Sequence, residues 1–325
     1  MCPSIRPDPG GGAPAVPALL VIVGPTAVGK SELAVLACER FAGEIVGVDS
    51  MQVYRGLDLG TAKPSADARR RVPHHGIDLA DPGRDFSLGD FVREAEQAID
   101  AIRSRGRLPV LVGGTGLYLR GLLKGIVGAP RRDEAIRARL RDRAAKRGTP
   151  YLHRLLRRVD PGAAARLPKA DRQRLVRALE VFFASRRGLS DWIGESPFGA
   201  DRYGSVKIGL NMDRAALYRI IDARVLGFFA AGLVDEVRGL VRAGCPETAN
   251  AFKAIGYHEA LRHMRGEIGL DEAIALTQRS TRRYAKRQWT WFRKEEGVTW
   301  FTIDAADPDR FAAPLAHAAR ALGRG

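Results

Sequence analysis

The sequence predicts an α/β protein with a parallel-sheet core and an inserted, mainly helical subdomain. Short apolar runs at residues 18–23, 44–48 and 108–112 alternate with segments of helical spacing, a pattern typical of parallel strands joined by helical crossovers. A glycine-rich loop follows the first run directly. From about residue 131 to 205 an arginine-rich stretch with helical spacing and no clear strand interrupts the alternation.

The other elements are predicted from the same two periodicities. Helices are expected over residues 33–41, 90–105, 117–123 and 271–293, and over 214–242 as one long helix or two; strands are expected over 206–210 and 300–303. The core is thus expected to comprise residues 18–130 and 206–325, with the insertion at 131–205. Residues 1–17 contain five prolines and three consecutive glycines, which predict a disordered tail.

The glycine-rich loop matches the pattern G-x-x-x-x-G-K-[ST] of a P-loop, and it has the required strand before it and helix after it. Its residues are Gly24, Pro25, Thr26, Ala27, Val28, Gly29, Lys30 and Ser31. In such a loop the glycines let the backbone approach a phosphate, successive amides form an anion-binding nest, and the helix N-terminus adds positive charge. Lys30 supplies a charge for terminal phosphates, and Ser31 a hydroxyl for Mg²⁺, which prefers oxygen ligands. The motif predicts phosphate and Mg²⁺ binding without identifying the phosphate compound.

Three loops with unusual chemistry follow predicted strands. Gly24, Asp49 and Gly113 each come directly after an apolar run. In parallel sheets, ligands bind beyond the carboxyl ends of the strands. We therefore expect these loops to converge on one site.

The charge of the chain is concentrated in the insertion. The whole chain carries a net charge of +16, and residues 131–187 hold 18 basic and 6 acidic residues, a local net charge of +12. Binding to a polyanion releases condensed counterions, so this block favours a polyanionic partner. A general bias toward arginine is the alternative, but bias alone would not localise the charge.

Other features exclude several protein classes. The three cysteines have no metal or redox spacing, and the adjacent His74 and His75 are expected in a structural turn rather than at a zinc site. No apolar run approaches the roughly 20 residues of a membrane span. These features predict a cytoplasmic protein, and nothing in the sequence points beyond a monomer.

Further motifs follow the P-loop in a defined order. They lie at residues 48–56, 60–64, 73–78, 112–118, 177–180, 232–237, 254–257, 281–288 and 290–293. Taken together, these motifs resemble the tRNA dimethylallyltransferase family, also called tRNA isopentenyltransferases, from about residue 19 to 303. The resemblance implies transfer of a dimethylallyl group from dimethylallyl diphosphate to N6 of adenosine 37 in tRNAs that read codons beginning with U. The P-loop would then hold an isoprenoid diphosphate, assisted by Mg²⁺.

The resemblance also implies three catalytic residues. Asp49 corresponds to the general base, Thr115 to the threonine near the leaving oxygen, and Arg224 to the arginine on the diphosphate. Position alone leaves other roles open: Asp49 could cap a helix, Thr115 could be an ordinary turn residue, and Arg224 could lie on a solvated helix face.

A tRNA-binding set spread over the chain is implied as well. It comprises Asp49, Ser50, Met51, Gln52, Thr115, Arg137, Gln173, Arg174, Leu175, Val176, Arg177, Lys253, Gly256, Tyr257, Arg282, Arg283, Lys286 and Arg287. Residues 279–294 carry seven basic and no acidic residues, with aromatic residues between them. This mixture suits RNA, although packing in the core explains the aromatic residues equally well.

Two other functions use parts of the same sequence. A small-molecule or nucleoside kinase would use ATP on the same loop, but it would leave the basic insertion unexplained. A non-catalytic RNA-binding protein would explain the charge and leave the P-loop without a role.

Overall fold

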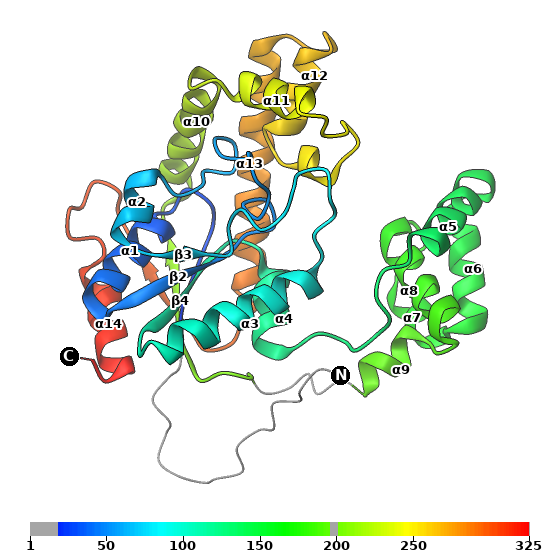
Figure 1. Ribbon diagram of the computed structural model, residues 1–325, viewed down its shortest axis with the longest axis horizontal. Coiled ribbons are helices and arrows are strands. Elements are labelled where there is room, and N and C mark those ends of the chain that lie inside the picture. The colour runs from blue at the N-terminus through cyan, green and yellow to red at the C-terminus, as the bar shows by residue number, and fades with distance from the viewer. Residues whose placement is uncertain (1–18, 196–200, 325) are drawn as a thin grey trace. The chain divides into compact units, whose positions relative to one another are not determined.

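The computed structural model describes residues 19–195 and 201–324, so the tail predicted at residues 1–17 lies outside the described residues. Within them, six strands form one sheet in the order β3-β2-β4-β1-β5-β6, and every neighbouring pair is parallel. The strands are β1 (Leu19–Val23), β2 (Gly43–Val48), β3 (His74–His75), β4 (Leu108–Gly113), β5 (Ser205–Asn211) and β6 (Val298–Thr302). The predicted α/β fold with a parallel-sheet core is confirmed (Figure 1).

Helices join these strands and extend beyond the sheet. Those outside the insertion are α1 (Lys30–Phe41), α2 (Ala66–Arg71), α3 (Leu88–Ser104), α4 (Gly116–Lys124), α10 (Arg214–Ala230), α11 (Leu233–Arg242), the short 3₁₀ helix η1 (Asn250–Lys253), α12 (Tyr257–Met264), α13 (Leu270–Phe292) and α14 (Ala312–Leu322). No helix in residues 19–195 and 201–324 is long and apolar enough to cross a membrane.

The sheet is covered on both faces, as the apolar character of its parallel strands requires. In β1, Leu20 and Ile22 belong to the cluster that includes α1 and α14, whereas Leu19 and Val21 belong to the cluster that includes α3 and α4. Figure 1 shows α1 and α14 on one side of the sheet and α3 and α4 on the other. This two-sided packing leaves the carboxyl ends of the strands as the open edge for a site.

One predicted alternative is decided by the structure, and two predicted elements differ from it. Segment 214–242 forms two helices, because Gly232 adopts a left-handed conformation with φ of 98° at the start of α11. The turn predicted at His74 and His75 is wrong: these residues pair with β2 as an edge strand, and His75 Nε2 lies 2.7 Å from Glu44 Oε2. The last strand covers 298–302 rather than 300–303.

The chain divides into two compact units. One comprises the described residues up to Leu123 together with those from Asp201 onward, and the other begins at Lys124 and ends before Asp201. The junctions predicted at residues 130 and 206 thus lie a few residues away from those in the structure. The Arg202 amide donates to the Leu123 carbonyl oxygen at 2.7 Å, and this bond closes the first unit. Within the second unit, Arg177 donates to the Pro130 carbonyl oxygen at 2.8 Å and so fixes the segment that precedes the first helix of this unit.

The second unit is helical and has a core of its own. Its helices are α5 (Glu134–Arg147), α6 (Thr149–Val159), α7 (Pro161–Arg166), α8 (Arg172–Ser185) and α9 (Leu189–Gly194). Leucines from α5, α6 and α8 meet in this core. Beside it, the buried Glu180 carboxylate accepts hydrogen bonds from the Asp133 amide at 2.7 Å and from Arg177 at 3.0 Å. These hydrogen bonds offset the cost of burying the carboxylate.

Candidate functional site

The order of the strands brings the three predicted loops together. β2, β4 and β1 are neighbours and run in the same direction, so Asp49, Gly113 and Gly24 leave the sheet at one edge. Gly24 has φ of +143°, and a Cβ at this position would lie 2.4 Å from the Leu210 carbonyl oxygen. This position therefore requires glycine.

The P-loop passes from β1 into α1 through backbone conformations that favour inward-facing amides. Ala27 and Gly29 have positive φ values of 70° and 96°. Lys30 is the first residue of α1, only 9% exposed, and its Nζ donates to the Pro25 carbonyl oxygen at 2.7 Å. The Lys30 ammonium is thus folded back over the loop, where it faces any phosphate bound by the amides.

Burial gives Lys30 an unusual proton affinity. Desolvation, reinforced by repulsion from Arg224 and opposed by attraction to Asp49, lowers the pKa of Lys30 to about 7. These electrostatic couplings bring Arg224 and Asp49 into the surroundings of the same amine. The P-loop lysine, the predicted base and the predicted diphosphate ligand therefore lie near one another, and their roles stay predictions.

Asp49 is partly buried, and one of its two carboxylate oxygens is held in place. Oδ1 accepts hydrogen bonds from the amides of Met51 at 2.8 Å and Gln52 at 3.2 Å. No described residue donates to Oδ2. Asp49 thus caps a turn, and no helix begins there. Burial raises the pKa of Asp49, while the two amides and Lys30 oppose that rise. A carboxylate with one fixed oxygen, one free oxygen and an increased proton affinity is suited to accept a proton.

Thr115 lies beside this carboxylate, on the turn between β4 and α4. Its Oγ1 accepts a hydrogen bond from the Ser50 amide at 3.1 Å, so the turn is joined to the residue after Asp49. The hydroxyl of Tyr284, on α13, lies 3.4 Å from the carbonyl oxygen of Gly114, the residue before Thr115. Thr115 is therefore part of the site rather than an isolated turn residue.

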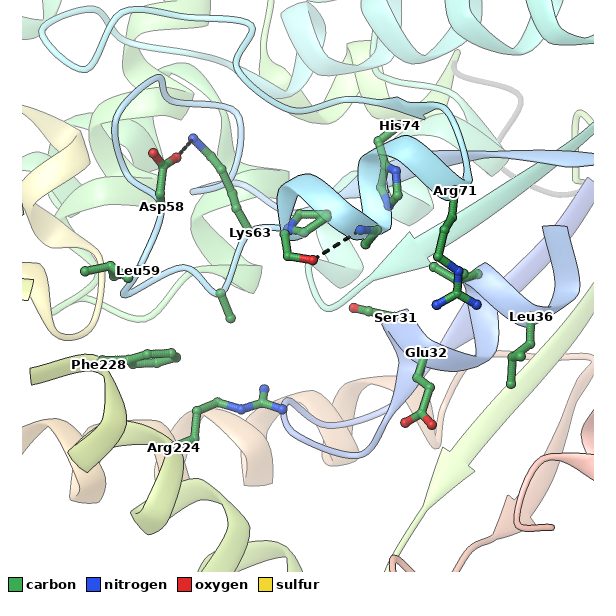
Figure 2. A pocket seen from close by; sticks show the side chains of 15 residues that line it. Ser31, Glu32, Leu36, Asp58, Leu59, Lys63, Arg71, His74, Arg224 and Phe228 are labelled. Carbon is green, nitrogen blue, oxygen red and sulfur yellow. Dashed lines mark hydrogen bonds and ion pairs between the residues drawn. The ribbon is translucent and has the colours of Figure 1, made fainter. Parts of the chain in front are cut away.

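Arg224 reaches the site across a cleft of about 600 Å³ in the first unit. Figure 2 shows its guanidinium extending from α10 toward the start of α1, where Ser31 lies. Apolar side chains, among them Leu59 and Phe228, line another part of the cleft. Although much of Arg224 is exposed, desolvation within the cleft lowers its pKa. Arg224 thus lies on an exposed helix face that lines the cleft, and its contact with the diphosphate stays a prediction.

The side chains near the P-loop fit a Mg²⁺ ion only in a limited way. No group of three or more His, Cys, Asp or Glu side chains gathers in the described part of the chain. The exposed Ser31 hydroxyl faces the cleft and can supply one oxygen ligand. This small donor set fits an ion that takes most of its ligands from a diphosphate and from water.

The site also contains Gln288, a residue that motif analysis did not assign to catalysis. It is 4% exposed on α13, accepts a hydrogen bond from the Thr26 amide at 2.7 Å, and donates to the Gly114 carbonyl oxygen at 3.0 Å. The sequence offered one signal for Gln288, because it is an uncharged side chain within a basic helix. That signal predicts that the side chain is buried, but not which groups it contacts.

Part of the predicted tRNA-binding set lines a basic groove of about 670 Å³ on α13 and α4 in the first unit. The groove is lined by Arg120, Arg283, Lys286, Arg287, Thr290, Trp291 and Lys294. Arg282 lies away from it and pairs with Asp222 of α10. Trp291 packs below the Arg120 guanidinium, 4.8 Å from ring centre to Cζ. The aromatic residue thus supports the groove from beneath.

Other members of the predicted set have structural roles. Leu175 and Val176 belong to the core of the insertion, so we correct the prediction that their side chains contact tRNA. The same correction applies to Tyr257, which is fully buried and donates its hydroxyl proton to Glu236. Gly256, next to it, is buried as well. Arg137 is 14% exposed, with Nε 4.0 Å from Glu180.

The remaining predicted tRNA-binding residues reach the surface. They are Ser50, Met51, Gln52, Gln173, Arg174, Arg177 and Lys253, each partly or fully exposed. Arg174 pairs with Asp171, and Lys253 hydrogen-bonds to Asn250.

The fold and the site are those of an α/β transferase with a P-loop. In this class of protein the phosphate-binding loop lies opposite a carboxylate. A family profile described as IPP transferase matches residues 52–295. The tRNA dimethylallyltransferase of Geobacter metallireducens is 50% identical over 282 residues, which cover 87% of this chain and 91% of that protein. The tRNA dimethylallyltransferase of Anaeromyxobacter sp. is 49% identical over 282 residues, covering 87% and 92%.

Solved structures give the same result. A tRNA isopentenylpyrophosphate transferase from Bacillus halodurans matches with a TM-score of 0.70 and 40% identity, over 94% of this chain and 96% of that one. A eukaryotic dimethylallyltransferase, described as acting on tRNA, matches with a TM-score of 0.77 and 26% identity, over 93% and 77%. The chain belongs to the IPP transferase family. It is therefore a prenyltransferase, not a kinase or a non-catalytic RNA-binding protein.

The lowered pKa of Lys30 predicts that a diphosphate binds together with a proton. At about pH 8 a group with a pKa near 7 is mostly neutral, and a bound diphosphate restores its charge, so up to about one proton is taken up. At about pH 6 Lys30 is already charged, and this uptake disappears. Calorimetric titration with dimethylallyl diphosphate in buffers of different ionisation enthalpy measures the uptake.

Lys30→Met is the matched control for that measurement. It removes the contribution of the amine and leaves the protonation of the diphosphate itself unchanged. Equal proton uptake by the variant and the parent protein at the higher pH would show that Lys30 is already charged in the free site.

Proposed function

We propose that the protein transfers the dimethylallyl group of dimethylallyl diphosphate to N6 of adenosine 37 in tRNAs that read codons beginning with U. The products are N6-isopentenyladenosine and diphosphate. The observation that supports the proposal most directly is that the P-loop, with Lys30, and the loop of Asp49 emerge at the same edge of the sheet. Membership in the IPP transferase family supports the same chemistry.

On the donor side, the chain stabilises the charge that develops on the leaving diphosphate. Loop amides other than that of Thr26, which donates to Gln288, and the Lys30 ammonium would face one side of the anion, and Arg224 would reach it from α10 across the cleft. Donors held in place before the reaction lower its barrier more than donors that must reorganise. Mg²⁺ held at Ser31 would add positive charge to the phosphate oxygens.

On the acceptor side, Asp49 meets the exocyclic amine of the adenine. The amine nitrogen forms a bond to the allylic carbon as the bond from that carbon to the diphosphate oxygen breaks. The nitrogen then loses one proton, which Asp49 Oδ2 accepts while Oδ1 stays bonded to the Met51 and Gln52 amides. Thr115 is suited to orient the reacting groups from the adjoining turn.

The acceptor base has to leave its stack to reach this site. Enzymes that modify a base within a folded nucleic acid extrude that base into a pocket. The basic groove is suited to hold the phosphates of the flanking strand, which set the register without reading sequence. Because one chain supplies both the phosphate-binding loop and the general base, we propose that the protein acts as a monomer.

A direct assay tests the proposed function. The protein is incubated with unmodified tRNA that carries adenosine at position 37, dimethylallyl diphosphate and Mg²⁺, and the nucleosides are then weighed by mass spectrometry. We expect a five-carbon gain on that adenosine. Transfer of the ATP γ-phosphate with no such gain would overturn the proposal in favour of a kinase.

Replacement of Asp49 separates its chemical role from its structural role. Asp49→Asn keeps an oxygen for the Met51 and Gln52 amides but removes the proton acceptor, so we expect kcat to fall about 100-fold or more with tRNA affinity retained. Asp49→Ala also removes the oxygen that caps the turn. Single-turnover kinetics and filter binding measure the two effects. If Asp49→Asn lost tRNA binding and turnover equally, Asp49 would be structural.

Two neighbouring arginines on α13 test the groove. Arg283→Ala removes a groove cation and should weaken tRNA binding, reducing the slope of log affinity against log salt by about 0.7–0.9. Arg282→Ala removes a cation that is paired with Asp222 outside the groove, so its salt slope should stay at the parent value. Identical slopes for both variants would exclude the groove as the phosphate contact.

A further inference from the structure

The amide of Gln288 connects the two halves of the site. Its Oε1 accepts from the Thr26 amide of the P-loop at 2.7 Å, and its Nε2 donates to the carbonyl oxygen of Gly114 at 3.0 Å. Gly114 directly precedes Thr115. A single buried side chain therefore bonds the loop that grips the diphosphate and the turn that carries Thr115.

The helix that carries Gln288 packs directly on this turn. A Cβ at Gly114 would lie 1.9 Å from Gln288 Nε2, and a Cβ at Gly116 would lie 2.1 Å from Trp291 Nε1. Tyr284, one turn before Gln288 on the same face of α13, has its hydroxyl 3.4 Å from the Gly114 carbonyl oxygen. Both glycines are thus needed for the close approach of α13, apart from any role in phosphate binding.

Beyond the paired strands, the Gln288 amide is a direct link between these two loops. The last registered pair between β1 and β4 is Ile22 with Val112, and the P-loop and the Thr115 turn both begin after it. Thr115 is in turn bonded to the Ser50 amide, next to Asp49. The distance from the leaving group to the base therefore depends on how the two loops are joined.

We propose that Gln288 is a positioning residue that sets the separation of the diphosphate-binding loop from the Thr115–Asp49 side of the site. This inference rests on the proposed transfer reaction. Reacting atoms must come within about 3–3.5 Å of each other, and a displacement of about 1 Å can cost 100-fold in rate. The side chain touches neither substrate; it acts through the two loops.

Gln288→Met tests the inference. Methionine is similar in length and shape, so it keeps the packing on Gly114 and loses both hydrogen bonds. The matched control is Gln278→Met on the same helix, where the amide donates to the Asp222 carbonyl oxygen on α10 and touches neither loop. We expect kcat with dimethylallyl diphosphate and tRNA to fall about 10- to 100-fold for Gln288→Met alone. tRNA affinity should be the same in the two variants. Gln288→Met should melt at a lower temperature because it leaves the Thr26 amide and the Gly114 carbonyl oxygen without this partner, so kcat is compared well below both melting temperatures.

Each outcome bears on the proposal. Equal kcat values for the two methionine variants would overturn it, because packing would then be the only role of Gln288. If Gln288→Met does not fold, Gln288→Glu takes its place: it keeps an acceptor for the Thr26 amide and sets an oxygen against the Gly114 carbonyl. A folded Gln288→Glu variant with parental kcat would also overturn the proposal. Absence of turnover in the parent protein would instead refute the proposed function.

Discussion

The shared direction of three neighbouring strands is the constraint on which the site depends. Because β2, β4 and β1 are adjacent and parallel, their loops emerge at one edge, and residues far apart in the chain become neighbours. Packing on both faces of the sheet leaves that edge as the place where polar loops can gather. The P-loop follows β1, the Asp49 carboxylate follows β2 and Thr115 follows β4. The residues of the site therefore come from three loops that the sheet holds side by side.

Burial of the Lys30 amine at that edge lowers the free energy of unfolding of the protein when no diphosphate is bound. Lys30 is nearly fully buried and its pKa is about 7, so in the unfolded chain it binds a proton more tightly than in the fold. At about 1.4 kcal/mol per pKa unit, keeping the amine charged costs several kcal/mol. A lowered pKa means that this cost is fully present below pH 7 and shrinks as the pH rises. A bound diphosphate offsets it, and the binding site is therefore completed by its own ligand.

The sequence predicted those parts of the site that depend on local pattern. The P-loop, Asp49 and Gly113 each follow an apolar run, so strand periodicity alone located them at one edge. Positions that depend on tertiary contacts were not predictable in this way. Gln288 lies within a basic helix, and only the packing of α13 on the glycine turn shows that it faces inward. Leu175 and Tyr257 fell within the family motifs but are core residues, because a motif covers buried and exposed helix faces alike.

The hydrogen bond between Arg202 and Leu123 also indicates which part of the chain can be replaced without loss of the fold. It joins the two points where the chain leaves and re-enters the sheet unit, so the whole helical insertion is topologically a single surface loop with adjacent ends. Insertions at such points are tolerated because the host needs no contact from the inserted segment to close its own core. The segment can therefore change in length, or be exchanged for one with a different surface, without any rearrangement of the strands of the first unit.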